Sequence, residues 1–141
     1  MRSDASGPGR GREEEPLHYD DFIPSVQVRS GRPRDETETL VHATLRVLAE
    51  RLTAGEADDL RAQLPGELQV DLVPPEPEAQ PFGPDEFARR VARIARVSEA
   101  EARAGMVAVL ATTRDAVEPG EFDDVLSQLG EEFARLVPGT G

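Results

Sequence analysis

The chain has 141 residues, a length that suits one domain, and 28 Asp and Glu against 16 Arg without any Lys give it a net charge of −12. Such a charge repels phosphate groups, so we expect neither nucleic acid nor an anionic membrane as a partner. The absence of Cys excludes disulfides and thiolate chemistry, and no apolar run approaches the roughly 20 residues of a membrane span. We therefore expect a cytoplasmic protein.

The first part of the chain, residues 1–17, is rich in Gly, Ser, Pro and charged side chains and holds few residues that could be buried. Ordering it would cost conformational entropy that no apolar burial offsets. We predict a disordered N-terminal tail over residues 1–17, followed by a single helical domain over residues 18–138.

The domain is organised around a stretch that occurs twice. Residues 55–64 read GEADDLRAQL and residues 120–129 read GEFDDVLSQL. At the offset that places Gly55 on Gly120, positions 20–72 align with positions 85–137 without a gap and hold 13 identities, six of them inside the repeated stretch. We predict an internal duplication, with repeat one over residues 18–73, a Pro-rich linker over 74–82 and repeat two over 83–138.

In the first repeat the sequence predicts four helices. The first begins near residues 18–20 and buries Phe22 and Val26. The second runs from about residue 33 to about residue 52, with a wide apolar face at helical spacing formed by Leu40, Val41, Thr44, Leu45, Leu48 and Leu52. The third contains the repeated stretch and stops at Pro65, and a short fourth helix follows.

In the second repeat, Pro84 begins the first helix, and Ser98 with Glu101 has the pattern of a capping box at the start of the second. The apolar face of that second helix has smaller side chains, so we expect this repeat to pack more loosely. A unit of roughly 55 residues buries only about 60% of its surface, so the two repeats should share a core. We predict an all-α fold: a compact helical domain of two tandem similar repeats.

Two interpretations are open for the polar side chains of the repeated stretch. In the first, Glu56 and Glu121 cap their helices, since Glu56 follows Thr53 at capping-box spacing and Glu121 holds the same helical position after Pro119. The aspartates are then a solvated face. In the second, the stretch forms a recognition face, or a cation site, made of Glu56, Asp58, Asp59, Gln63, Glu121, Asp123, Asp124 and Gln128.

We assign no catalytic, cofactor-binding or metal-binding residue. His18 and His42 have no His or Cys partner at zinc spacing. Glu38 and His42 are separated by one helical turn and could form an acid–base pair, but Val107 stands at the matching place of the second repeat, so we expect His42 to be a helix-surface residue. The serines lack a nucleophile elbow of the Gly-x-Ser-x-Gly type.

Two motifs carry a resemblance to a known family. They are Tyr-Asp-x-Phe at residues 19–22 and Leu-x-x-Gly-Glu-x-x-Asp-Leu-x-x-Gln-Leu-Pro at residues 52–65, separated by a long aliphatic helix. With these motifs the chain is similar to DUF2267, a bacterial family of small all-helical proteins without an established function. The resemblance covers Tyr19 to about Pro138 and implies a compact helical domain, with no catalytic residues to transfer.

Functions of different classes remain open. The charge, the repeated polar face and the lack of a catalytic constellation favour a non-enzymatic interaction module that presents an acidic surface to a protein partner with a basic surface. The alternatives are a metal-assisted enzyme that uses the repeated carboxylates, and a binder of a small apolar ligand around Gly105, Met106 and Thr113.

Overall fold

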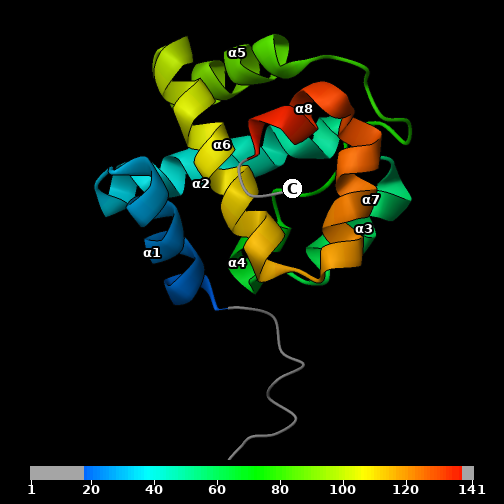
Figure 1. The fold of residues 1–141 in the computed structure, drawn as a ribbon, viewed down its shortest axis with the longest axis horizontal. Helices are drawn as coiled ribbons and strands as arrows, with labels where there is room; N and C mark the ends of the chain where they lie inside the picture. The colour runs from blue at the N-terminus through cyan, green and yellow to red at the C-terminus, as the bar shows by residue number, and fades with distance from the viewer. Residues whose placement is uncertain (1–17, 138–141) are drawn as a thin grey trace, which may run out of the picture.

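A computed structural model describes residues 18–137, which contain eight helices and no strand (Figure 1). The predicted all-α fold is confirmed for this part of the chain. The disordered tail is predicted for residues 1–17, which lie outside the described part. Pro138, at the end of the predicted domain, lies outside it too.

Each of the first four helices begins at a position that corresponds, at the offset of the repeated stretch, to the first residue of one of the last four. The linker, residues 74–82, contains no helix and lies between the two groups. The helices are α1 Tyr19–Ser30, α2 Arg34–Arg51, α3 Ala54–Arg61, α4 Gly66–Gln69, α5 Pro84–Ala95, α6 Glu99–Ala116, α7 Pro119–Leu129 and α8 Glu131–Leu136.

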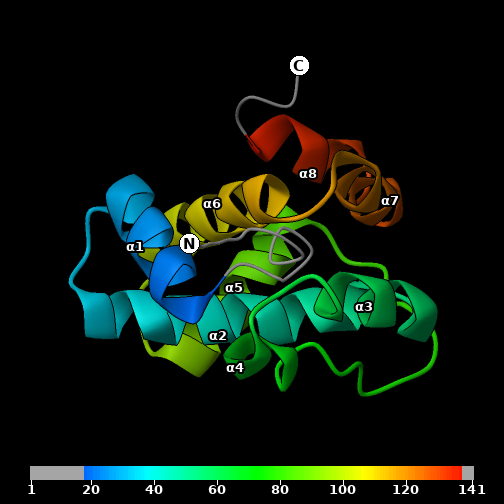
Figure 2. The ribbon, with the colours of Figure 1, turned by 90° about the horizontal axis from the view of Figure 1, so that it is seen from below.

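The two long helices, α2 and α6, contact each other at the centre of the fold (Figures 1 and 2). Helix α1 packs on both of them, and so does α5. Phe22, Leu45, Phe87 and Leu110, one from each of these four helices, are all fully buried in one apolar cluster. The helices of the first and second halves therefore contribute to the same core.

The small side chains of α6 do not loosen this core where α6 meets α2. A Cβ built on Gly105 would lie 2.9 Å from two carbon atoms of the Leu40 side chain, and Met106 and Thr113 are fully buried. The expectation of looser packing is therefore wrong at Gly105. A large side chain from α2 occupies the space that the small residue of α6 leaves.

The helix ends follow the local sequence. Ser98 and Glu101 form the predicted capping box at the start of α6. The residue that follows α1 is Gly31, which has the left-handed backbone that glycine favours (φ 72°). The residue that follows α5 is Arg96, in the same conformation (φ 61°). Arg96 aligns with Gly31 at the offset of the repeated stretch, so the left-handed position that follows α1 as glycine follows α5 as arginine. A residue with a side chain is strained in this conformation.

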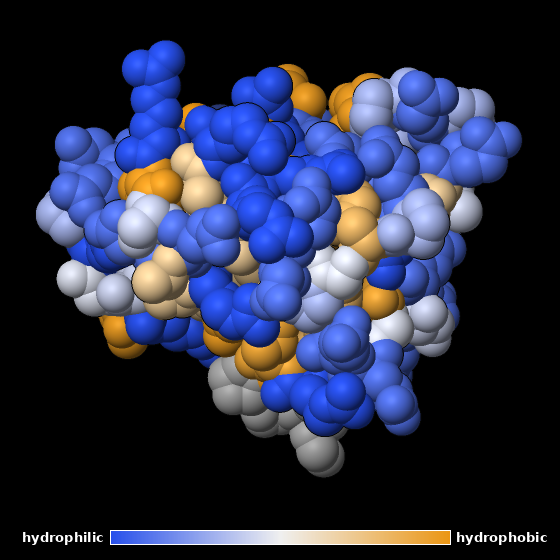
Figure 3. Space-filling model, turned by 90° about the horizontal axis from the view of Figure 1, so that it is seen from above, coloured by the Kyte–Doolittle hydropathy of each residue, from blue (hydrophilic) through white to orange (hydrophobic). Residues whose placement is uncertain are grey.

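The surface seen in Figure 3 is mostly hydrophilic, with hydrophobic atoms in small separate areas. The large apolar side chains that are exposed come from different parts of the chain and are Val28, Val70, Val73 and Ile94. In the described residues, none of the helices is both long enough and apolar enough to cross a membrane.

Candidate functional site at the contact of α3 and α7

Helices α3 and α7, which carry the two copies of the repeated stretch, pack against each other at the end of the molecule opposite α1 (Figures 1 and 2). The eight residues of the predicted recognition face lie on these two helices or just after α3. Four of them are exposed: Asp58, Asp59, Asp123 and Asp124. The other four are partly buried between the helices: Glu56, Gln63, Glu121 and Gln128.

The two glutamines cap each other's helices. The backbone N–H of Thr53, the residue before α3, donates to Gln128 Oε1 at 3.0 Å. In the same way the N–H of Glu118, the residue before α7, donates to Gln63 Oε1 at 2.8 Å. An unpaired N–H group at a helix start is a donor that needs an acceptor, and here Gln128 of α7 and Gln63, just after α3, supply the two acceptors. The side-chain oxygens of Gln63 and Gln128 are therefore used by the fold.

This exchange prevents the capping box predicted for α3. Glu56 N donates to Thr53 Oγ1 at 3.3 Å, which is half of the box. The other half would be a bond from Thr53 N to the Glu56 carboxylate, but that N–H is bonded to Gln128. Glu118 at the start of α7 has no side-chain cap bond either. The prediction that Glu56 and Glu121 cap their helices through their side chains is therefore wrong.

The carboxyl groups of Glu56 and Glu121 instead face each other between α3 and α7. The Oε2 atom of each is buried, and neither has a hydrogen-bond partner in the described residues. Burial, together with the hydrogen bond and negative charge of Glu56 and the charges of Asp59 and Asp124, raises the pKa of Glu121 to about 8. Glu101, which does complete a capping box, behaves in the opposite way: the backbone bond from Ser98, then Arg32, lower its pKa.

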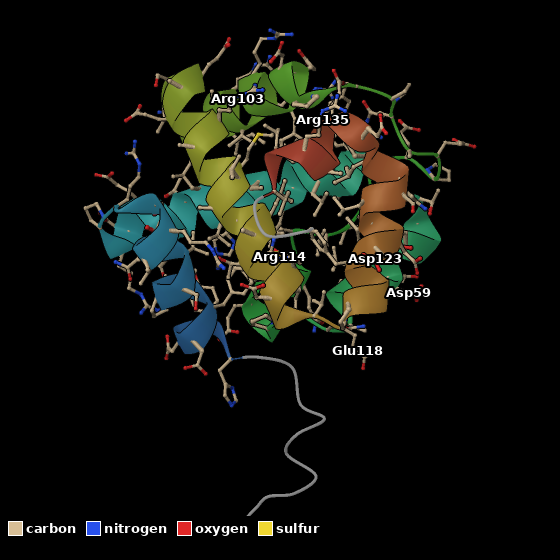
Figure 4. The ribbon with its side chains drawn as sticks, in the orientation of Figure 1. Asp59, Arg103, Arg114, Glu118, Asp123 and Arg135 are labelled. Atoms are coloured by element: carbon tan, nitrogen blue, oxygen red, sulfur yellow. The ribbon has the colours of Figure 1, made fainter. Side chains whose placement is uncertain are left out.

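The exposed aspartates differ in their partners. Asp58 pairs with Arg61 one turn along α3. Within residues 18–137, no hydrogen bond or ion pair joins Asp59, Asp123 or Asp124 to another side chain. Figure 4 shows Asp59 and Asp123 at the end of the molecule that α3 and α7 form, with Glu118 at the start of α7. We call Asp59, Asp123 and Asp124 the acidic face.

Residues 19–136 match the family described as "Uncharacterized conserved protein (DUF2267)". The chain belongs to this family. The match spans α1 to α8, which confirms the resemblance predicted from the two motifs. No curated protein matches the chain.

The carboxylates of this DUF2267 domain do not gather in the way a metal ion requires. Oxygen-binding cations such as calcium take six to eight oxygen ligands in their preferred sites. In the part of the chain that the structure describes, no group of three or more His, Cys, Asp or Glu side chains could hold a metal ion.

His42 is not the plain surface residue that the sequence suggested. Its Nδ1 atom bonds to Asp71, just after α4, and its Nε2 atom lies 3.2 Å from the hydroxyl of Tyr19 on α1. That hydroxyl donates to Glu38 at 3.0 Å, so Glu38 and His42 meet through Tyr19. Burial and then Glu38 raise the pKa of Tyr19 to about 12, which makes the phenol a poor acid near neutral pH. The cluster joins α1, α2 and the end of α4.

Arg51, to which the sequence gave no role, is the buried cation beside the α3–α7 contact. It is 7% exposed and donates to the carbonyl oxygens of Gln80, Gln128 and Leu129 at 3.1, 3.1 and 2.6 Å. Its guanidinium carbon lies 5.6 Å from the ring centre of Phe82 and 5.5 Å from that of Phe133. Backbone carbonyls leave no trace in a sequence pattern, so no local signal could identify these partners.

Two surface hollows in the described part of the chain are similar in size. One, of about 480 Å³, lies at the start of α5 and includes Arg89, Arg103 and Arg135, which pair with Glu86, Asp85 and Glu131. The other, of about 470 Å³, lies between the end of α6 and α7 and includes Arg114, Phe122 and Asp123. Figure 4 shows Arg103 and Arg135 on one side of the molecule and Arg114 and Asp123 on another. Neither hollow coincides with the Glu56–Glu121 contact.

Proposed function

We propose that this DUF2267 domain is a non-enzymatic cytosolic interaction module, built by internal duplication, that binds a protein partner with a basic surface through its acidic face. The observation that carries the proposal is the packing of α3 on α7, which places exposed, unpaired carboxylates of both copies of the repeated stretch at one end of the molecule.

The duplication is supported by the helix positions and by the contacts between the halves. The four helix pairs all start at corresponding positions of the two repeats. The bond from Glu118 to Gln63 repeats the bond from Thr53 to Gln128 at the same offset, with the roles of the two copies exchanged. A two-fold arrangement of this kind doubles the number of aspartates that a partner meets.

Charge supports the choice of a basic partner. The net charge of the chain is −12, and among residues 18–137 no Arg forms an ion pair with Asp59, Asp123 or Asp124. Complementary charges at the rim of an interface increase association rates and fix orientation, and they act over a Debye length of about 8 Å at physiological salt. A basic protein surface is the partner whose association the negative charge of the acidic face would speed most.

The test compares two double variants with the same change in net charge. Asp59→Asn with Asp124→Asn alters the acidic face, whereas Glu76→Gln with Glu78→Gln alters exposed carboxylates of the linker. Each protein is immobilised, and basic proteins are captured from cytosol at low and raised salt. We expect the acidic-face variant to bind the captured partner about tenfold more weakly, a loss of roughly 1.4 kcal/mol in binding free energy. The linker variant should bind it as tightly as the wild type. Equal capture by the wild-type chain and the acidic-face variant would refute the proposal.

A further inference from the structure

The contact between Glu56 and Glu121 leaves two hydrogen-bond acceptors without a donor. Both Oε2 atoms are buried, and no donor among the described residues reaches either of them. Buried polar atoms in proteins are nearly always hydrogen-bonded, because an unpaired one has lost its water without compensation. Glu56 is within hydrogen-bonding reach of Glu121, and a bond between two carboxyl groups requires a proton on one of them, so two ionised groups leave both oxygens unpaired.

The charges around Glu121 also favour a bound proton. Glu56 and Asp59 of α3 and Asp124 of α7 all add negative charge at this carboxyl. The cations nearby in the sequence are engaged elsewhere: Arg61 of α3 pairs with Asp58, and Arg51 donates to backbone carbonyls.

The other two helices that contact α7 place their charged groups on different flanks. From α6, Arg114 and Asp115 line the hollow that includes Asp123. From α8, Glu132 and Arg135 line the hollow at the start of α5, and Glu131 pairs with Arg135 at 3.5 Å. Negative charges therefore dominate the environment of the Glu56–Glu121 pair.

We propose that Glu56 and Glu121 share one proton and act as a pH-sensitive latch between α3 and α7. With the proton bound, the carboxylic acid of one residue donates to the carboxylate of the other, a charge-assisted bond of the strong kind. When hydroxide removes the proton as water, two carboxylates face each other and both buried oxygens lose their donor. The contact is then weakened by repulsion and by the unpaired atoms.

The direction of the pH effect follows from proton binding. The pKa of Glu121 is about 8 in the folded chain, against an ordinary value of 4.5. Between these values the folded state holds a proton that the unfolded state has lost, so stability falls as pH rises. The contribution of the pair is complete below pH about 4.5 and is lost as pH rises through about 8. The latch thus opens on the alkaline side of neutrality, and it does not depend on the proposed function.

The first test is a carboxyl ¹³C NMR titration of the chain labelled in glutamate. In the wild-type protein we expect the carboxyl carbon of Glu121 to report a step near pH 8. In Glu56→Gln the amide donates to Glu121 and removes a charge, so the step of Glu121 should shift down by about two pH units or more. Glu101→Gln, at the same helical position of α6, is the matched control and should keep the step unchanged. Titration of the wild-type Glu121 carboxyl near its ordinary value of 4.5 would overturn the proposal.

The second test measures the mechanical consequence. Glu121→Gln supplies a donor at every pH, so its thermal unfolding midpoint should match the wild-type value near pH 5 and exceed it by roughly 4 °C or more at about pH 8.5. Amide exchange gives a local readout: the protection of Thr53 and Glu118, whose N–H groups bond across the contact, should fall above about pH 8 in the wild type only. The proposal fails if the difference in unfolding midpoint between Glu121→Gln and the wild type is the same at both pH values. It also fails if the amide protection of Thr53 and Glu118 in the wild type does not change with pH.

Discussion

Leu40 of α2 and Gly105 of α6 touch where the two long helices meet. A Cβ on Gly105 would lie 2.9 Å from both Leu40 methyl carbons, and Leu40 is only 1% exposed. At the offset of the repeated stretch, the sequence aligns position 40 with position 105. A large residue on one helix is therefore accommodated by the absence of a side chain on the other.

This contact predicts that Gly105→Ala destabilises the domain. Alanine favours a helix over glycine by about 1 kcal/mol, but overpacking a buried contact costs about 1–3 kcal/mol. We expect a net loss of about 1 kcal/mol in the free energy of unfolding, measured by urea denaturation.

Two further variants provide the controls. In a Leu40→Ala background, Gly105→Ala should become stabilising because its methyl group then has room. Gly55→Ala, whose Cβ would meet nothing within 4 Å, should not destabilise. If Gly105→Ala lowers the free energy of unfolding equally with Leu40 and with Ala at position 40, its cost does not come from the contact with Leu40.

The exchanged glutamines predict a stability cost on both helices. Gln63→Ala leaves the N–H of Glu118 without its acceptor, and Gln128→Ala does the same for Thr53. Each change should lower the free energy of unfolding by about 0.5–1.5 kcal/mol, which chemical denaturation can measure. Ser127→Ala, an exposed neighbour on α7, is the control and should have little effect. Losses no larger than that of the control would show that solvent replaces these bonds.

The buried cation predicts a larger effect. Arg51→Met removes the donor of three carbonyl groups and should cost roughly 2–4 kcal/mol, seen as a lower unfolding midpoint. Arg51→Lys should recover little of this, because an ammonium group lacks the planar fork that reaches several acceptors. Arg46→Met, on the exposed side of the same helix, is the matched control. A lysine variant as stable as the wild type would show that charge alone suffices.

The strained end of α5 predicts a stabilising substitution. Arg96 has a φ of 61°, a conformation that costs a side-chain-bearing residue roughly 1–2 kcal/mol and glycine very little. Arg96→Gly should therefore raise the free energy of unfolding by up to about 1 kcal/mol, part of the gain being offset by greater freedom of the unfolded chain. The reciprocal change, Gly31→Ala at the end of α1, should lower it. Thermal denaturation of both variants checks the opposite signs.

The sequence predicted most of the fold, because the signals involved are local. Helical spacing of apolar residues placed α2 correctly to within about one residue at each end. Pro84 and the Ser98–Glu101 pattern fixed the starts of α5 and α6, since the groups that satisfy these helix ends lie within the first turn. The alignment of the two repeats predicted which helices begin at corresponding positions.

The candidate site was predicted only as a set of residues. Glu56, Gln63, Glu121 and Gln128 were identified from their recurrence, but capping and recognition were the only roles that the sequence offered them. The structure shows that the glutamines cap across the contact and that the glutamates meet each other. The capping-box pattern at Thr53 was misleading because Gln128, which is distant in the sequence, takes the same N–H.

The sequence by itself determined where most helices begin, which faces are apolar and that two similar stretches exist, because each follows from neighbouring residues or from comparison along the chain. The predicted end of the third helix at Pro65 was wrong, since α3 ends at Arg61. Only the tertiary structure decided that α3 packs on α7, that Leu40 meets Gly105 and that Asp71 reaches His42. The physical reason is that the sequence around a polar residue is the same whether its side chain faces water or the equivalent residue of another helix. Its pKa and its hydrogen-bond partner are set by the helix packed against it.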